Sequence, residues 1–179
     1  LRGRYFSTES MPVTSPTAPP RVLTGSILFL LAGLAAMGSL ATNVILPVFP
    51  SMGVSLGVEP RDLALTLSSF FIAFAVGQLF VGPLADRFGR KPLVVGGLIT
   101  FVVGSAICAL AHTLDMLILG RIVQALGACA ASVLARAIAR DLFDGEALAR
   151  VLALIMIAMA AAPGFSPLVG TGLGALLGW

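Results

Sequence analysis

Charged residues are scarce in this sequence. Asp, Glu, Lys and Arg make up 11% of the 179 residues, whereas 58% are hydrophobic and the mean hydropathy is +1.05. Soluble domains carry about 25% charged residues. Because the few charges here cannot coat a water-facing surface, the composition argues against a soluble domain and indicates a protein embedded in lipid.

Cysteine and histidine are rare as well. Cys108 and Cys129 lie inside apolar runs, no Cys-x-x-Cys pair occurs, and His112 is the single histidine. Isolated cysteines in apolar surroundings are typically small buried side chains, so we expect no metal site and no cofactor. The sequence also lacks a G-x-x-x-x-G-K-[ST] loop and a cluster of nucleophile, base and metal ligands. These absences disfavour ATP hydrolysis and a membrane enzyme.

Five apolar runs are long enough to cross a membrane, because about 20 helical residues span the hydrocarbon of a bilayer. The runs show no alternation of apolar and polar residues, which favours helices over barrel strands. The predicted spans cover about residues 22–46, 63–81, 93–111, 116–137 and 148–172, with a possible start of a sixth before Trp179. The predicted fold class is therefore an all-α membrane protein, a polytopic transmembrane helix bundle.

The two ends of the sequence suggest a part of a longer protein. Residues 1–21 are rich in Ser, Thr and Pro, which predicts a disordered tail before a bundle over residues 22–179. The first residue is Leu1, and Met11 is a candidate for the true start. Because a sixth span has barely begun at Trp179, we expect the bundle to be incomplete.

The basic residues predict an orientation. If the spans alternate, nine of the eleven Lys and Arg residues fall on one side: Arg2, Arg4, Arg21, Arg87, Arg90, Lys91, Arg136, Arg140 and Arg150. Arg61 falls on the other side, and Arg121 lies within the fourth span. Cytoplasmic loops carry the excess of Lys and Arg, so we predict a multi-pass protein of the inner (plasma) membrane with a cytoplasmic N-terminus. The basic residues form no groove with aromatic platforms, so no nucleic-acid partner is expected.

One short segment, GPLADRFGRKP at residues 82–92, places a charged cluster between two uncharged runs. A loop that only sets orientation needs Lys or Arg but not the other residues present here. Gly82 is expected to let two helices approach closely, and Gly89 suits a turn with positive φ. Asp86 is expected to pair with a neighbouring guanidinium or to cap a helix.

This segment closely resembles the loop motif of the major facilitator superfamily, between the second and third helices. Three other segments agree: RIVQALGA at 121–128 resembles the fourth-helix motif, APGFSPLVG at 162–170 resembles the fifth helix of antiporters, and NVILPVFP at 43–50 resembles the end of helix one in drug exporters. Together they resemble the bicyclomycin and chloramphenicol resistance branch of drug:proton antiporters over about residues 25–179.

The resemblance implies an incomplete N-terminal half of a twelve-helix transporter, which binds substrate between two halves. It implies multidrug efflux, with a small amphipathic drug-like substrate, protons as coupling ion and a missing C-terminal half as partner. It further implies that a gating motif at the cytoplasmic loop is formed by Gly82, Asp86, Arg87, Gly89, Arg90 and Lys91.

Candidate transport residues lie within the first and fourth spans. Arg121 is costly in lipid, roughly 2.5–3.5 kcal/mol at a helix centre. Arg121, Gln124 and Ser132 share a helix face that is expected to line a cavity for substrate or proton coupling. The alternative is that Arg121, about 9 Å from Asp115 along the helix, extends to the interface. Asn43, with Ser39, is expected to face the same cavity or to bond another helix.

The fifth span contains Pro163 and Pro167, each of which removes a backbone donor and favours a kink. With Gly164 and Gly170 they predict a bendable, closely packed helix that serves as a rocking contact or as a seal against proton leak. The alternative is simple packing of small residues.

Acidic residues are missing from the middle of every predicted span, and Asn43 aligns with a position that is acidic in many exporters of this branch. A proton-coupled exporter needs a group that titrates within the membrane. The coupling group therefore lies outside this sequence or at the interface, or the mode of transport differs. Two alternatives stay open: a metabolite exporter or importer of the same superfamily, and a truncated membrane fragment that does not transport.

Overall fold

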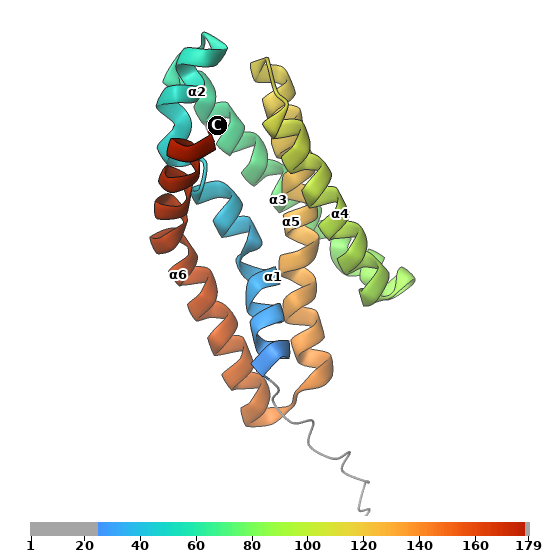
Figure 1. Cartoon of the computed structure of the whole chain (residues 1–179). Helices are drawn as coiled ribbons and strands as arrows, with labels where there is room; N and C mark the ends of the chain where they lie inside the picture. The colour runs from blue at the N-terminus through green and yellow to red at the C-terminus, as the bar shows by residue number, and fades with distance from the viewer. Residues whose placement is uncertain (1–24, 178–179) are drawn as a thin grey trace, which may run out of the picture.

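The computed structural model describes residues 25–177, which form helices and no strands. In chain order the elements are α1 (Gly25–Asn43), the short 3-10 helix η1 (Leu46–Val48), α2 (Phe49–Leu56), α3 (Pro60–Phe88), α4 (Arg90–Ala109), α5 (Leu114–Leu142) and α6 (Gly145–Leu177). The long helices run side by side as a bundle (Figure 1). The predicted all-α class is confirmed, and the predicted disordered tail over residues 1–21 lies outside the described residues.

Each predicted span overlaps one of the five described helices that are long and apolar enough to cross a membrane. The helices α3 and α5 extend past the predicted edges, because each continues into charged end turns. The first turns contain Asp62 and Asp115, and the last turns contain Arg87 and Arg140. Acidic first turns and basic last turns complement the helix dipole.

Two details of the prediction are wrong. No sixth helix begins within the described residues, since α6 continues unbroken past Gly172 to Leu177. The prediction gave no helix between the first two spans, but η1 and α2 lie there. Pro47 and Pro50 stand near the starts of these two helices, where a missing N–H costs nothing.

The helix α5 forms the centre of the bundle, and α1, α3 and α4 pack around it. Glycines make the contact with α4 unusually close. A methyl group on Gly104 would overlap the backbone of Gln124, and one on Gly127 would overlap the backbone of Phe101. Small residues are the usual means of close helix packing in membranes. The seam between α4 and α5 therefore brings polar groups of the two helices within hydrogen-bond range.

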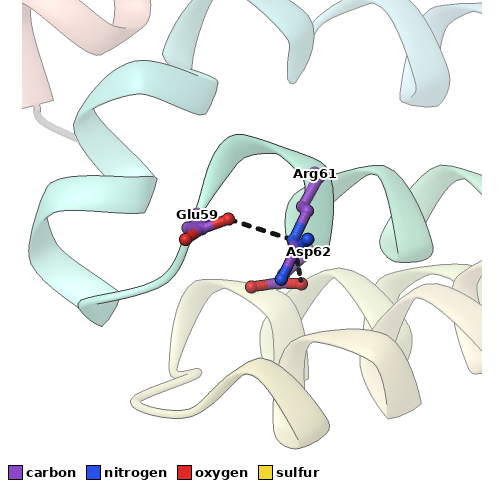
Figure 2. A network of polar contacts seen from close by, with 3 residues as sticks. All are labelled: Glu59, Arg61 and Asp62. Atoms are coloured by element: carbon purple, nitrogen blue, oxygen red, sulfur yellow. Dashed lines mark ion pairs between the residues drawn. The ribbon is translucent and has the colours of Figure 1, made fainter.

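The α3–α4 and α5–α6 connections lie at one end of the bundle, and α2 and the α4–α5 connection lie at the other (Figure 1). The basic end, with the α3–α4 and α5–α6 connections, carries Arg87, Arg90, Lys91, Arg140 and Arg150. The acidic end, with α2 and the α4–α5 connection, carries Glu59, Asp62 and Asp115. Its Arg61 is paired, with Nε 3.0 Å from Glu59 and 3.8 Å from Asp62 (Figure 2). The assignment of the basic end to the cytoplasm stays a prediction.

Candidate functional site

A polar network centred on Arg121 joins three helices inside the bundle. The Arg121 side chain is 1% exposed. Its Nη1 donates hydrogen bonds to the Ala41 carbonyl of α1 at 3.0 Å and to Gln124 Oε1 at 2.6 Å. Gln124 Nε2 donates in turn to Ser105 Oγ of α4 at 2.8 Å. The network therefore connects α1, α5 and α4 at one level of the bundle.

The local structure explains why each partner is available. Because α1 ends at Asn43, the Ala41 carbonyl is among the last four of the helix, which lack partners within it. Gly104 allows α4 close enough for Ser105 to reach Gln124. The Phe70 ring of α3 covers the guanidinium, with Arg121 Cζ 4.5 Å from the ring centroid. Three neighbouring helices thus hold one charged side chain in place.

The positive charge of Arg121 has no carboxylate partner among the described residues. Its Nε and Nη2 atoms are buried and lack a hydrogen-bond partner in the part of the chain that the structure describes. Unpaired buried charges are costly and mark functional positions in membrane proteins. The alternative in which the side chain extends to the interface is wrong, because the side chain turns to α1 and Gln124 instead.

Arg121 and Gln124 lie in the wall of a cavity of about 420 Å³. The cavity is otherwise mainly apolar and is bounded by α1, α4, α5 and the last turns of α6, including Leu40, Phe101, Leu117 and Leu173. An apolar cavity with a few convergent polar groups is typical of a small-molecule site. This geometry places two of the predicted cavity residues together.

Asn43 does not line the cavity of Arg121 and Gln124. Asn43 and Ser39 line a second cavity of about 270 Å³, together with Phe70, Phe74 and Ser132. A different face of α1 lines this cavity, so the expected shared cavity with Arg121 is wrong for Asn43. The alternative of a bond to another helix is wrong too, because Asn43 Nδ2 donates to the Ser39 carbonyl of its own helix at 2.8 Å.

At the charged loop, Gly89 alone separates α3 from α4 and has a φ of 87°. L-residues with side chains rarely adopt this conformation, so glycine is required for so short a turn. The expected close approach at Gly82 is wrong within the described chain, because no atom lies within 4 Å of a methyl group placed there. Gly82 stands in the interior of α3, away from the glycine seam.

The charged residues of the loop pair differently from the prediction. Asp86 is exposed, forms no ion pair with a described residue and does not cap α4. Arg90 instead reaches across to the end of α5, with its Nε 2.6 Å from Asp141 Oδ2. Arg87 lies over the Phe88 ring at 5.4 Å, and Lys91 is exposed. The ion pair ties the start of α4 to the end of α5.

Sequence reasoning missed Asp141 as a partner of the loop. A signal was present, because the orientation argument already places the end of the fourth span on the same side as the loop. Arg136 lines a third cavity, which lies between α5 and α6. In the sequence, this residue served only to predict the orientation of the protein in the membrane.

The two prolines of the fifth span lie inside α6, which continues through both as one helix. Gly170 packs directly against the Val44 carbonyl, and a methyl group on Gly174 would meet Val48 at 2.6 Å. Among residues 25–177 no atom lies within 4 Å of a methyl group placed on Gly164, so the expected close packing is wrong at that position within this part of the chain. The bend at Pro163 and Pro167 stays a prediction.

Comparison with known proteins is consistent with this arrangement. The family model of the Major Facilitator Superfamily matches residues 28–179. The chloramphenicol resistance protein of Pseudomonas aeruginosa is 36% identical over 151 residues, which are 84% of this chain and 36% of that protein. Multidrug resistance protein D of Escherichia coli K12 is 27% identical over 154 residues, 86% of this chain and 39% of that protein.

A third relative, the uncharacterized MFS-type transporter YdgK of Bacillus subtilis 168, is 36% identical over 157 residues, 87% of this chain and 38% of that protein. The chain thus spans less than two fifths of the length of these curated relatives.

Proposed function

Because the chain belongs to the Major Facilitator Superfamily, we propose that it is part of a secondary transporter that exports amphipathic drugs across the plasma membrane in exchange for protons. Membership of this family points to a transporter rather than an enzyme. The observation that carries the proposal is the similarity, over most of this chain, to proteins named for chloramphenicol and multidrug resistance. The activity is proposed for the whole protein, because this chain covers less than two fifths of those relatives.

The geometry supports a role for the Arg121 network in this function. Arg121 and Gln124 provide fixed donors at an apolar cavity, which suits a neutral, amphipathic drug with carbonyl or hydroxyl groups. The two unpaired donors of Arg121 need an acceptor, and a substrate or a coupling group supplies one. The network joins α1, α4 and α5, so a change in the position of Arg121 alters contacts of all three helices.

The basic end carries the proposed gate, on the cytoplasmic side. Gly89 permits the tight turn, and the pair between Arg90 and Asp141 fixes that turn to α5. Such a partly exposed ion pair is weak, about 0.2–1 kcal/mol. A contact of that strength breaks and reforms readily during a cycle between inward-open and outward-open states.

Proton coupling needs a group that titrates. Within residues 25–177, every Asp and Glu lies at a helix end or in a connection, and Asn43 does not titrate. We therefore place the proton carrier either among the acids of the basic end, Asp86 above all, or in parts of the protein outside these residues. Asp86→Asn tests the first of these candidates.

The test uses the full-length protein in proteoliposomes, with labelled chloramphenicol and an imposed pH gradient. Uptake against the drug gradient that stops when an ionophore collapses the pH gradient is the expected result. Asp86→Asn lowers the coupling if the loop acid carries the proton and leaves it intact otherwise. Arg61→Gln, at the opposite end and outside the network, serves as the control. Absence of gradient-driven uptake of any drug would contradict the proposal and favour a metabolite transporter or a protein that does not transport.

A further inference from the structure

A second arginine of α5, Arg136, is held far less firmly than Arg121. Its side chain is half-buried, and Nη1 donates to Ser132 Oγ at 3.3 Å and to the Met159 thioether of α6 at 3.8 Å. A thioether sulfur is a weak acceptor. The described residues offer Arg136 no carboxylate. Most of its hydrogen-bonding capacity is therefore free for another group.

Arg136 opens onto a third cavity, of about 560 Å³, between α5 and α6. Arg140, one helical turn farther along the same face, lines it as well. The remaining wall is apolar and comes from α6: Leu152, Ile155, Met156, Met159 and Ala160. The volume lies within the range of about 300–1,000 Å³ that is typical of small-molecule sites.

The third cavity adjoins the second one. Met159 lines both, and Ser132, which lines the second cavity, accepts the hydrogen bond from Arg136. Polar groups therefore run from Asn43 and Ser39 in α1, past Ser132, to the two arginines near the basic end. None of the residues that line either cavity is acidic.

The positive charges of Arg136 and Arg140 determine which sign of ligand charge this cavity prefers. Two guanidinium groups one helical turn apart repel each other, and an anion between them removes that repulsion. Guanidinium groups bind carboxylate and similar oxyanions with paired, charge-assisted hydrogen bonds. The apolar α6 wall suits the rest of an amphipathic molecule. A cationic ligand would instead add a third positive charge to the cavity.

We propose that this cavity binds the anionic group of an amphipathic ligand, a carboxylate, sulfonate or ionised phenol, on Arg136 and Arg140. As a statement about the substrate, the proposal rests on the function proposed above. It specifies that the transporter prefers anionic amphipathic compounds over cationic ones of the same shape.

A pair of dyes with the same xanthene ring and opposite charge tests this directly. The anion fluorescein and the cation rhodamine 123 are titrated with the full-length protein in detergent, and binding is followed by fluorescence anisotropy. We expect tighter binding of fluorescein. Arg136→Gln is expected to raise the Kd for fluorescein at least about tenfold, while the Kd for rhodamine 123 stays the same or falls. Arg136→Lys keeps the charge and is expected to retain part of the affinity.

Arg150→Gln is the matched control, because Arg150 is an exposed arginine of the same end that lines none of the three cavities. It is expected to leave both Kd values unchanged. Equal losses for both dyes in Arg136→Gln would show that Arg136 maintains the shape of the cavity rather than binding the ligand charge, and would overturn the proposal. Tighter binding of rhodamine 123 by the unmodified protein, or no binding of fluorescein, would overturn it as well.

Anionic lipid is a second source of the same chemistry. The titrations are therefore repeated with phosphatidylglycerol or phosphatidylcholine added to the detergent. Displacement of fluorescein by phosphatidylglycerol alone, at lower concentrations than the dye requires, would assign the cavity to lipid and overturn the substrate preference. Binding is measured without a gradient, so this outcome is independent of the transport assay. Drug transport with no preference between the dyes would leave the function standing and remove only this inference.

Discussion

The two halves of α5 hold their arginines in different ways. In the half nearer the acidic end, Arg121 is almost fully buried, bonded to a backbone carbonyl and an amide, and covered by a phenyl ring. In the half nearer the basic end, Arg136 is half-buried and bonded to a hydroxyl and a thioether. Both arginines line cavities and keep donors without a partner among the described residues, but Arg121 is buried within the bundle whereas Arg136 is partly exposed.

Packing explains the difference. Gly104, Gly120 and Gly127 let α4 pack closely against the first half of α5, which brings Gln124 within hydrogen-bond range of Ser105. The second half of α5 borders α6 at the third cavity, and Arg136 stays partly exposed there. Close packing thus lets one backbone carbonyl and one amide hold part of the Arg121 guanidinium inside the bundle. The packing beside Arg136 leaves its guanidinium open to a cavity.

The largest expected effect comes from opening the close seam. Gly104→Leu forces a side chain into the backbone of Gln124, and overpacking costs about 1–3 kcal/mol or more. We expect a large loss of folded protein, seen as a lower Tm in detergent. Gly96→Leu, on the same helix with open space around it, is expected to leave the Tm nearly unchanged. Equal effects of the two substitutions would contradict the close packing of the seam.

The second largest effect is expected from removing the buried charge of Arg121. Arg121→Met keeps the volume but removes the bonds to Ala41 and Gln124, and hydrogen bonds to charged groups are worth about 1.5–3 kcal/mol. A free-energy loss of this size corresponds to a rate that is roughly 10- to 100-fold lower, so we expect gradient-driven drug transport to fall by that factor. Arg121→Lys is expected to rescue little, because a lysine cannot bond two acceptors in the same planar arrangement. Full activity of Arg121→Met would show that the network is only structural.

A smaller effect is expected at the N-terminus of α5, in the half of the helix that carries Arg121. Thr113 Oγ1 accepts a hydrogen bond from the Met116 backbone N–H at 3.3 Å and so caps the helix. Thr113→Ala is expected to cost about 1 kcal/mol of stability, measured by unfolding in mixed detergent. Thr100→Ala is the control, since Thr100 bonds only the Gly96 carbonyl within its own helix, and is expected to cost nothing. A similar loss in both would argue against the cap.

The smallest effect is expected at the end of α5 that lies at the basic end. A double-mutant cycle with Arg90→Ala and Asp141→Ala is expected to give a coupling energy of about 0.2–1 kcal/mol, because the pair is partly exposed. The coupling is expected to shrink at high salt. The same cycle with Asp86 in place of Asp141 is expected to give no coupling. Coupling of Arg90 to Asp86 but not to Asp141 would contradict the observed pairing.

Much of the fold was predictable because lipid imposes simple rules. The lengths of the apolar runs place all five long helices, and the positive φ of Gly89 follows from the spacing of the charged loop. The short helix α2 was not predictable from apolar length. The signal present was Pro47 and Pro50, because proline favours the first turn of a helix.

The candidate site was only partly predictable, because contacts between helices depend on how each helix is rotated. Arg121 and Gln124 are close in sequence, so their shared face follows from helical spacing. The bond from Arg121 to the Ala41 carbonyl depends on where α1 ends, and the placement of Asn43 depends on how α1 is turned. Composition does not distinguish a glycine that packs, such as Gly104, from one that does not, such as Gly82.

The most direct test of the difference between the two arginines is chemical modification of the unmodified full-length protein. Phenylglyoxal reacts with accessible guanidinium groups, and mass spectrometry of peptides reports each position. We predict that Arg136 reacts at a rate near that of the exposed Arg150 and is protected by fluorescein, whereas Arg121 reacts far more slowly in the folded protein. Reaction of Arg121 as fast as Arg136 in the folded protein would contradict the account.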